Sequence, residues 1–264
     1  MITWEHPDIQ DKELFRQLYK MQEQERGIFR RLFEKRELDP AWLEGLTELS
    51  LTGLQIKSFA FLRLCPNLKE LELGRCDLTQ VQDTGSYVQL ADLTIAGETL
   101  SDPSFLYAFP NVTMLSLCDI RQFGDLSILG GMDHLDTLSL IDTAAFDLYL
   151  LRDCEQLRML FICAAEEDPA PFDFRDLAAL KQLHALDLDG MGLTDLSLLA
   201  PLTQLRNLYV CSEGELYHAE SLTQLNHLQN LILEGKNFTR DTIHRLKERF
   251  SYVPTCMISA PDNG

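Results

Sequence analysis

Three acidic residues have the spacing that comes nearest to a chemical site. Glu70 and Glu72 lie in an alternating stretch, so a strand would place both carboxylates on one face about 7 Å apart. Asp92 should sit across from them on the next strand. Neighbouring carboxylates can carry out acid–base chemistry or bind Ca²⁺. In a chain with 41 acidic residues such proximity is expected by chance, so we predict no catalytic residues, no metal site and no cofactor.

Histidines and glycine-containing motifs give no stronger sign of chemistry. His134, His184 and His227 each adjoin an apolar position of a repeat and do not have the spacing of metal ligands. The sequence has no G-x-x-x-x-G-K-[S/T] phosphate loop and no G-x-S-x-G nucleophile turn. We therefore predict that the protein is not an enzyme.

The elements that must position these side chains are copies of one repeat. Residues 183–193 read L-H-A-L-D-L-D-G-M-G-L, which is the pattern of a strand that turns and returns along a second face. The same frame fits nine copies, whose first positions are 22, 22, 22, 23, 22, 26, 22 and 23 residues apart. These positions are Leu46, Leu68, Leu90, Val112, Leu135, Leu157, Leu183, Leu205 and Leu228. The register predicts a solenoid whose repeats bury their apolar faces against each other.

Residues 193–208, L-T-D-L-S-L-L-A-P-L-T-Q-L-R-N-L, and the 22-residue length resemble the leucine-rich repeats of bacterial internalins and of the phosphatase-regulatory-subunit type. The resemblance covers residues 46–238. It implies an α/β fold, a right-handed leucine-rich repeat solenoid with a concave parallel β-sheet. It also implies protein–protein recognition and no catalytic residues.

One position departs from this family, which usually places Asn where the strand turns. Without that amide, backbone groups at the turn must find other partners. The residues present here are Leu54, Cys76, Glu98, Ile120, Thr143, Ala165, Met191, Glu213 and Lys236.

The return segments and one insertion complete the repeat region. D-L-S-I-L at 125–129 and D-L-S-L-L at 195–199 predict a turn or a short 3₁₀ helix, because 22 residues leave little room for more. The sixth repeat is four residues longer than its neighbours, with the insertion around residues 164–171. This insertion is either a solvated loop or part of a binding face.

A helical pattern precedes the repeats. Over residues 8–37, apolar side chains recur at three- and four-residue steps, and Gly27 is a place where two helices could divide. We expect Leu38, Asp39 and Pro40 to end the helix. The apolar positions are Phe15, Leu18, Tyr19, Ile28, Phe29, Leu32 and Phe33. Residues 1–45 are interpreted as an N-terminal cap; a dimerising or partner-binding helix is the alternative.

A second helical pattern comes after the repeats, in residues 239–264. Residues 239–250 predict a helix with Thr239 as its N-cap. Its buried stripe is Ile243, Leu246 and Phe250. We expect Cys256, Met257 and Ile258 to close the core, and residues 260–264 to be loose.

Charge and cysteine content limit the partners and the compartment. The net charge is −18, and residues 46–264 hold 15 basic and 31 acidic side chains, which gives −16 for the repeats and the C-terminal segment together. This field repels nucleic acid and anionic membrane. The seven cysteines are an odd number. Cys118, Cys163 and Cys211 share one strand phase on alternate repeats, roughly 10 Å apart. We expect reduced thiols in a cytoplasmic protein, because no signal peptide or membrane-spanning run is found.

The strand phase predicts which side chains face the hollow of the solenoid, because residues between the apolar positions alternate onto the open face. The first outward column is Glu48, Glu70, Asp92, Met114, Thr137, Met159, Ala185, Asn207 and Asn230. The second is Ser50, Glu72, Thr94, Ser116, Ser139, Phe161, Asp187, Tyr209 and Ile232. The third is Thr52, Gly74, Ala96, Cys118, Ile141, Cys163, Asp189, Cys211 and Glu234.

These columns are acidic at the first repeats and apolar in the middle. Outward apolar clusters, with aromatic residues and methionine, are typical of interfaces. We therefore predict a scaffold or regulatory module whose concave face binds a basic and partly apolar protein. Self-association through the helix or the apolar patch, as a homodimer, is the alternative. The candidate residues are Met114, Ile141, Met159, Phe161, Asp187, Asp189, Tyr209, Ile232, Glu70, Glu72 and Asp92.

Overall fold

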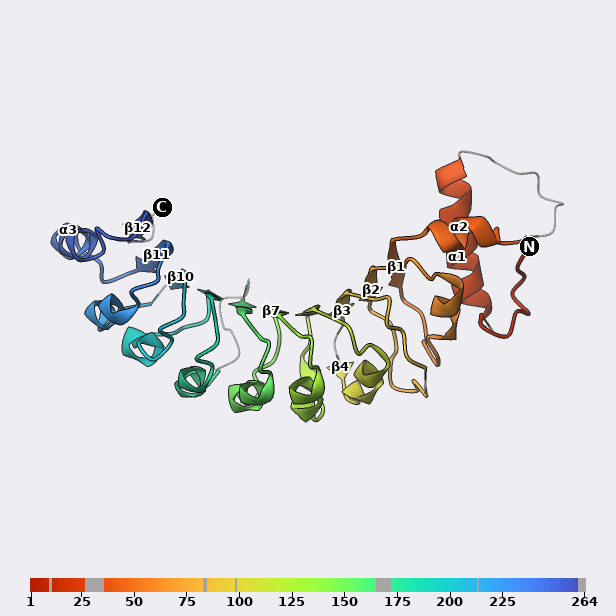
Figure 1. The fold of residues 1–264 in the computed structure, drawn as a ribbon, viewed down its shortest axis with the longest axis horizontal. Coiled ribbons are helices and arrows are strands. Elements are labelled where there is room, and N and C mark those ends of the chain that lie inside the picture. The colour runs from red at the N-terminus through yellow and green to blue at the C-terminus, as the bar shows by residue number, and fades with distance from the viewer. Residues whose placement is uncertain are drawn as a thin grey trace.

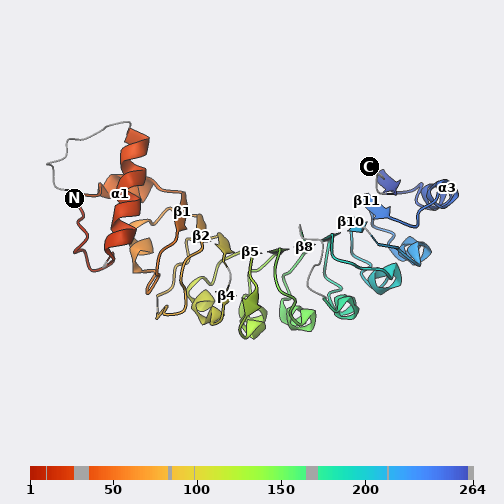
Figure 2. The ribbon, with the colours of Figure 1, turned by 180° about the vertical axis from the view of Figure 1, so that it is seen from behind.

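The chain folds into an arc, which a computed structural model describes over residues 1–9, 11–26, 36–82, 85–97, 99–164, 172–212 and 214–260. One parallel sheet of ten strands lines the inner side of the arc, and short helices lie on the outer side (Figures 1 and 2). In sheet order the strands are β1 (Glu48–Thr52), β2 (Glu70–Gly74), β3 (Asp92–Ala96), β5 (Met114–Cys118), β7 (Thr137–Ile141), β8 (Met159–Cys163), β9 (Ala185–Asp189), β10 (Asn207–Ser212), β11 (Asn230–Gly235) and β12 (Thr255–Ser259).

The repeated leucines build one continuous core. Leu160 of β8 pairs in register with Leu138 of β7 and Leu186 of β9, and all three are fully buried. The same pairing recurs along the sheet, so buried leucines stack from one repeat to the next. A single apolar cluster extends from Ile9 to Ile258. The predicted solenoid is confirmed, and its strand phase is as the sequence indicated.

The return segments are 3₁₀ helices, as predicted for residues 125–129 and 195–199. They are η1 (Ala60–Leu64), η2 (Pro103–Ala108), η3 (Leu126–Gly131), η4 (Leu148–Asp153), η5 (Phe174–Ala179), η6 (Leu196–Leu199) and η7 (Ala219–Gln224). Two return segments also form a small parallel sheet, in which β4 (Thr99–Leu100) pairs with β6 (Gln122–Phe123).

An aspartate caps five of these seven described helices. Its carboxylate accepts a hydrogen bond from the backbone N–H two residues later, as in Asp147 to Tyr149 at 2.9 Å. Such bonds stabilise the charged form. The pKa of Asp195 is lowered to about 2 by hydrogen bonds from Ser197 and His218. The caps are Asp102, Asp125, Asp147, Asp173 and Asp195.

Other groups replace the missing Asn at the strand turns. The Cys76 thiol donates to the carbonyls of Leu51 and Gly74, with sulfur–oxygen distances of 3.6 and 3.7 Å. Backbone bonds between repeats close other turns, such as Asp142 N–H to the Cys163 carbonyl at 2.9 Å. Thr143 is buried, and its hydroxyl has no hydrogen-bond partner among the described residues. Leu54, Ile120 and Met191 are buried apolar residues, Lys236 is exposed, and Glu98, Ala165 and Glu213 lie outside the described residues.

Helix α1 (Lys12–Arg26) covers the first strand. It begins four residues later than predicted, because the Asp11 carboxylate accepts the N–H groups of Glu13 and Leu14. The Gln17 side chain donates to the Thr52 carbonyl at 2.6 Å and accepts from its N–H at 3.3 Å, so α1 satisfies part of the free edge of β1.

A second helix, α2 (Pro40–Gly45), was not predicted. Asp39 and Pro40, which we expected to end a helix, instead begin α2 as its N-cap and first residue. Helices α1 and α2 lie within residues 1–45, which were interpreted as an N-terminal cap. The predicted apolar positions Ile28, Phe29, Leu32 and Phe33 lie outside the described residues.

The other end of the core is closed by α3 (Arg240–Arg249) and β12. Thr239 caps α3 as predicted, and Leu246 and Phe250 are fully buried whereas Ile243 is partly buried. Strand β12 was not predicted. It pairs parallel to β11 and buries Ile258, but it leaves Met257 58% exposed, so the expectation that Met257 closes the core is wrong. Residues 261–264 and the insertion at 165–171 lie outside the described residues.

Candidate protein-binding surface

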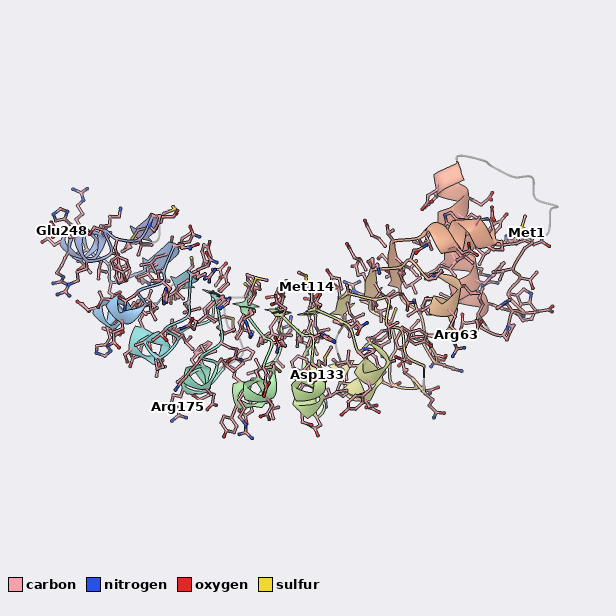
Figure 3. The ribbon with its side chains drawn as sticks, in the orientation of Figure 1. Met1, Arg63, Met114, Asp133, Arg175 and Glu248 are labelled. Carbon is pink, nitrogen blue, oxygen red and sulfur yellow. The ribbon has the colours of Figure 1, made fainter. Side chains whose placement is uncertain are left out.

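The three outward columns lie on the concave side of the sheet, as the sequence predicted. In the second column, Phe161 of β8 pairs in register with Asp187 of β9, and Asp187 pairs with Tyr209 of β10. All three are partly buried, whereas the alternate residues Leu160 and Leu208 are fully buried. Figure 3 shows Met114 on the hollow side of the arc and Arg175 on the outer side.

The acidic residues of the first strands lie at one end of this surface, beside α1. Glu70 pairs in register with Asp92, which confirms the predicted juxtaposition. Burial raises the pKa of Asp92. A pocket of about 350 Å³ opens here, lined by Met21, Glu48, Leu49, Ser50, Glu70, Leu71, Glu72, Asp92 and Thr94. Helix α1 therefore contributes a side chain to the acidic end as well as capping the core.

A second pocket, of about 910 Å³, lies at the carboxyl ends of β1 to β3. Gly74 and Ala96 occupy the third column here, so little side-chain volume fills it. Arg75, Asp77 and Asp119 are among the lining residues. This pocket was not predicted from the sequence, although two small residues at adjacent positions of the third column could have indicated it.

The middle of the surface exposes apolar side chains. Met114 is 39% exposed and Ile141 is 40% exposed. Thr137 is 4% exposed because it lies in register between Met114 and Met159, two longer side chains. The small residue therefore forms a floor between two methionines.

The last strands combine apolar and acidic residues. Asp187 has its pKa raised, first by burial and second by the neighbouring Asp189. Tyr209, Ile232 and Met257 are consecutive in register on β10, β11 and β12. Met257 was not among the residues predicted for the concave surface because strand β12 was not predicted. It extends the apolar stripe by one strand.

The cysteines of the third column do not provide reactive thiolates. Burial, followed by nearby aspartates, raises the pKa of both Cys163 and Cys211 to about 11. The pKa of Cys118 is raised as well, mainly by burial. These thiols are therefore protonated near neutral pH. Within the described ranges no three His, Cys, Asp or Glu side chains are grouped so as to hold a metal ion, and no helix is long and apolar enough to cross a membrane.

Comparison with known proteins identifies the fold. No family model matches the chain, and no curated protein sequence matches it. Its structure is similar to that of internalin C2 from Listeria monocytogenes, with 22% identity, coverage of 80% of this chain and 89% of that chain, and a TM-score of 0.57. Internalin F from the same organism gives 17% identity, 96% and 91% coverage, and a TM-score of 0.48.

A leucine-rich repeat protein from Leptospira interrogans gives 16% identity, coverage of 84% of this chain and 68% of that chain, and a TM-score of 0.48. The likeness to internalin C2 shows that this chain has the leucine-rich repeat fold.

Proposed function

We propose that this leucine-rich repeat solenoid is a non-enzymatic module that binds a partner protein on its concave face. The observation that carries the proposal is a stretch of apolar side chains that are exposed or partly buried on the concave face of the sheet. It comprises Met114, Ile141, Met159, Phe161, Tyr209 and Ile232, and Met257 continues it. Apolar side chains gathered on one concave surface favour a protein interface, because interface centres are enriched in aromatic residues and methionine.

The charges on the same surface indicate the chemistry of the partner. Glu70, Glu72 and Asp92 lie on one side of the apolar stretch, and Asp187 and Asp189 interrupt it on the other. No residue in the three columns of the ten described strands is Lys, Arg or His. A partner segment with basic residues around an apolar centre complements this arrangement, whereas nucleic acid and anionic membrane are repelled by it.

The module acts as a scaffold or a regulatory subunit in the cytoplasm under this proposal. All seven cysteines are free, which favours a reducing compartment. The raised pKa values of Cys163 and Cys211 also favour binding over chemistry on this face, because a protonated thiol is a poor nucleophile.

Panning of a random 12-residue peptide library on the purified chain tests this proposal. Selected peptides should combine Lys or Arg with apolar residues. Met159→Glu and Phe161→Glu should each abolish their binding, because both place a charge in the apolar centre. Tyr107→Glu is the matched control: Tyr107 is 69% exposed on η2, on the outer side of the arc.

Two results would count against the proposal. If the selected peptides bind the Met159→Glu and Phe161→Glu variants with the same affinity as the unmodified chain, the concave face is not the binding surface. Light scattering that finds a dimer at micromolar concentration, disrupted by the same substitutions, would favour self-association in place of a separate partner.

A further inference from the structure

Three basic residues stand side by side at the amino-terminal edge of the sheet, outside the three columns. Arg158, His184 and Arg206 immediately precede β8, β9 and β10. The His184 N–H donates to the Arg158 carbonyl at 2.7 Å, and the Arg206 N–H donates to the His184 carbonyl at 2.8 Å. Their side chains therefore leave three neighbouring strands at one level, with strands about 4.8 Å apart. We call these three residues the basic ladder.

The two arginines of the basic ladder are unusual in so acidic a protein. Acidic residues outnumber basic ones by 31 to 15 in residues 46–264. Yet within the described part of the chain no carboxylate lies within ion-pair distance of Arg158 or Arg206. Arg158 instead donates to the Glu155 carbonyl at 2.7 Å, which orients its guanidinium at the edge, and Arg206 is exposed.

Both arginines also affect the charge of His184. The pKa of His184 is lowered, first by burial and then by Arg206 and Arg158, while Asp136 acts in the opposite direction. Two guanidiniums thus lie near enough to disfavour a third positive charge between them. An anion placed on the ladder would relieve this repulsion, because it pairs with both arginines and favours the protonated imidazole.

We propose that Arg158, His184 and Arg206 form an oxyanion-binding site that takes a carboxylate side chain of the bound protein. Arg158 and Arg206 directly precede Met159 and Asn207, so the site adjoins the surface proposed to bind the partner. Asp189 lies five residues along the strand direction from His184, about 17 Å away. The bound segment is therefore bipolar, with an acid over the ladder, an apolar centre, and a base over Asp187 and Asp189. A carboxylate is favoured over a nucleic-acid phosphate because the −16 field of residues 46–264 repels a polyanion.

The identity of this ligand rests on the proposed function, but the anion site itself is testable alone. The probe is a short peptide with blocked ends and a single glutamate, and the readout is the ring C–H resonance of His184 by NMR, assigned with His184→Gln. The peptide should raise the pKa of His184 in a saturable way. Arg206→Gln should weaken binding about threefold or more, in line with the loss of one exposed charge pair. Arg249→Gln, on α3, removes the same charge elsewhere and should leave binding unchanged.

The proposal is overturned if the peptide leaves the titration of His184 unchanged, or if Arg249→Gln weakens binding as much as Arg206→Gln. A response to inorganic phosphate but none to the single-glutamate peptide would also overturn it, since the ligand would then be a phosphate. Arg206 has no hydrogen bond or ion pair from its side chain to the described residues, so Arg206→Gln should fold normally. Failure of this test leaves the panning result for Phe161→Glu unaffected, so the two proposals can fail separately.

Discussion

Replacing Leu160 by alanine should destabilise the protein far more than the same replacement of Phe161, its neighbour in β8. Leu160 is 0% exposed and lies between Leu138 and Leu186, which are also fully buried. Truncating such a leucine costs about 3 kcal/mol, from lost apolar burial and the cavity left behind. Phe161 lies on the hollow side and is only partly buried, between Ser139 and Asp187. Its truncation should cost about 1 kcal/mol, since less apolar surface returns to water.

The assay is urea unfolding followed by far-UV circular dichroism for the two variants and the unmodified chain. Repeat arrays can unfold in parts, so the comparison is made within one strand, where both substitutions affect the same repeats. Leu208→Ala and Tyr209→Ala in β10 provide a second pair with the same expected order. Equal losses, or a greater loss for Phe161→Ala, would refute the assignment of inward and outward positions. The proposed binding surface would then have no basis.

Three further outcomes are expected at the turns and caps. Thr143→Val should raise the free energy of unfolding by about 1 kcal/mol, because it removes a buried hydroxyl that has no partner among the described residues; a loss in the same urea assay would show that the hydroxyl is bonded. Asp147→Ala should lower it by about 1 kcal/mol through loss of the η4 cap, and no change would contradict the capping role. Acid should also destabilise the ends of η5 and η6. The pKa of Asp173 is about 2, lowered first by the Arg175 side chain and then by the cap hydrogen bond, and the pKa of Asp195 is about 2, lowered first by the Ser197 side chain. Both values lie below the ordinary 3.8, so this contribution to stability is present above about pH 4 and is lost as pH falls toward 2. The Asp173→Asn, Asp195→Asn double variant should therefore lose less stability than the unmodified chain over that pH range in a thermal-melting series.

Much of the fold and of the concave surface could be predicted because the leucine positions fix the phase of every strand in the nine repeats. Once Leu186 and Leu188 point inward, Asp187 must point outward. Strand β12 was missed because Thr255–Ser259 comes after a helix and has no leucine at the frame positions. Met257 was lost from the surface for the same reason.

Local ambiguity explains the other errors at the turns and at the N-terminus. The pair Asp39–Pro40 is compatible with the end of one helix or the start of another, and only packing decides between them. The thiol of Cys76 replaces an Asn amide through contacts with Leu51 and Gly74 that the sequence spacing does not reveal. The basic ladder lay outside the predicted columns because position two of the repeat was not assigned to a face.

The central claim is that a partner protein binds the apolar stretch of the concave face, and thiol footprinting tests this claim most directly. Cys163 and Cys211 lie in the third column on β8 and β10, the strands that carry Phe161 and Tyr209 of the apolar stretch, whereas Cys76 lies after β2. Because these thiols are protonated near neutral pH, their alkylation rates are measured at mildly alkaline pH by mass spectrometry, with and without a saturating selected peptide. We predict that the peptide slows alkylation of Cys163 and Cys211 and leaves the rate at Cys76 unchanged. Unchanged rates at Cys163 and Cys211 under saturating peptide would contradict the claim.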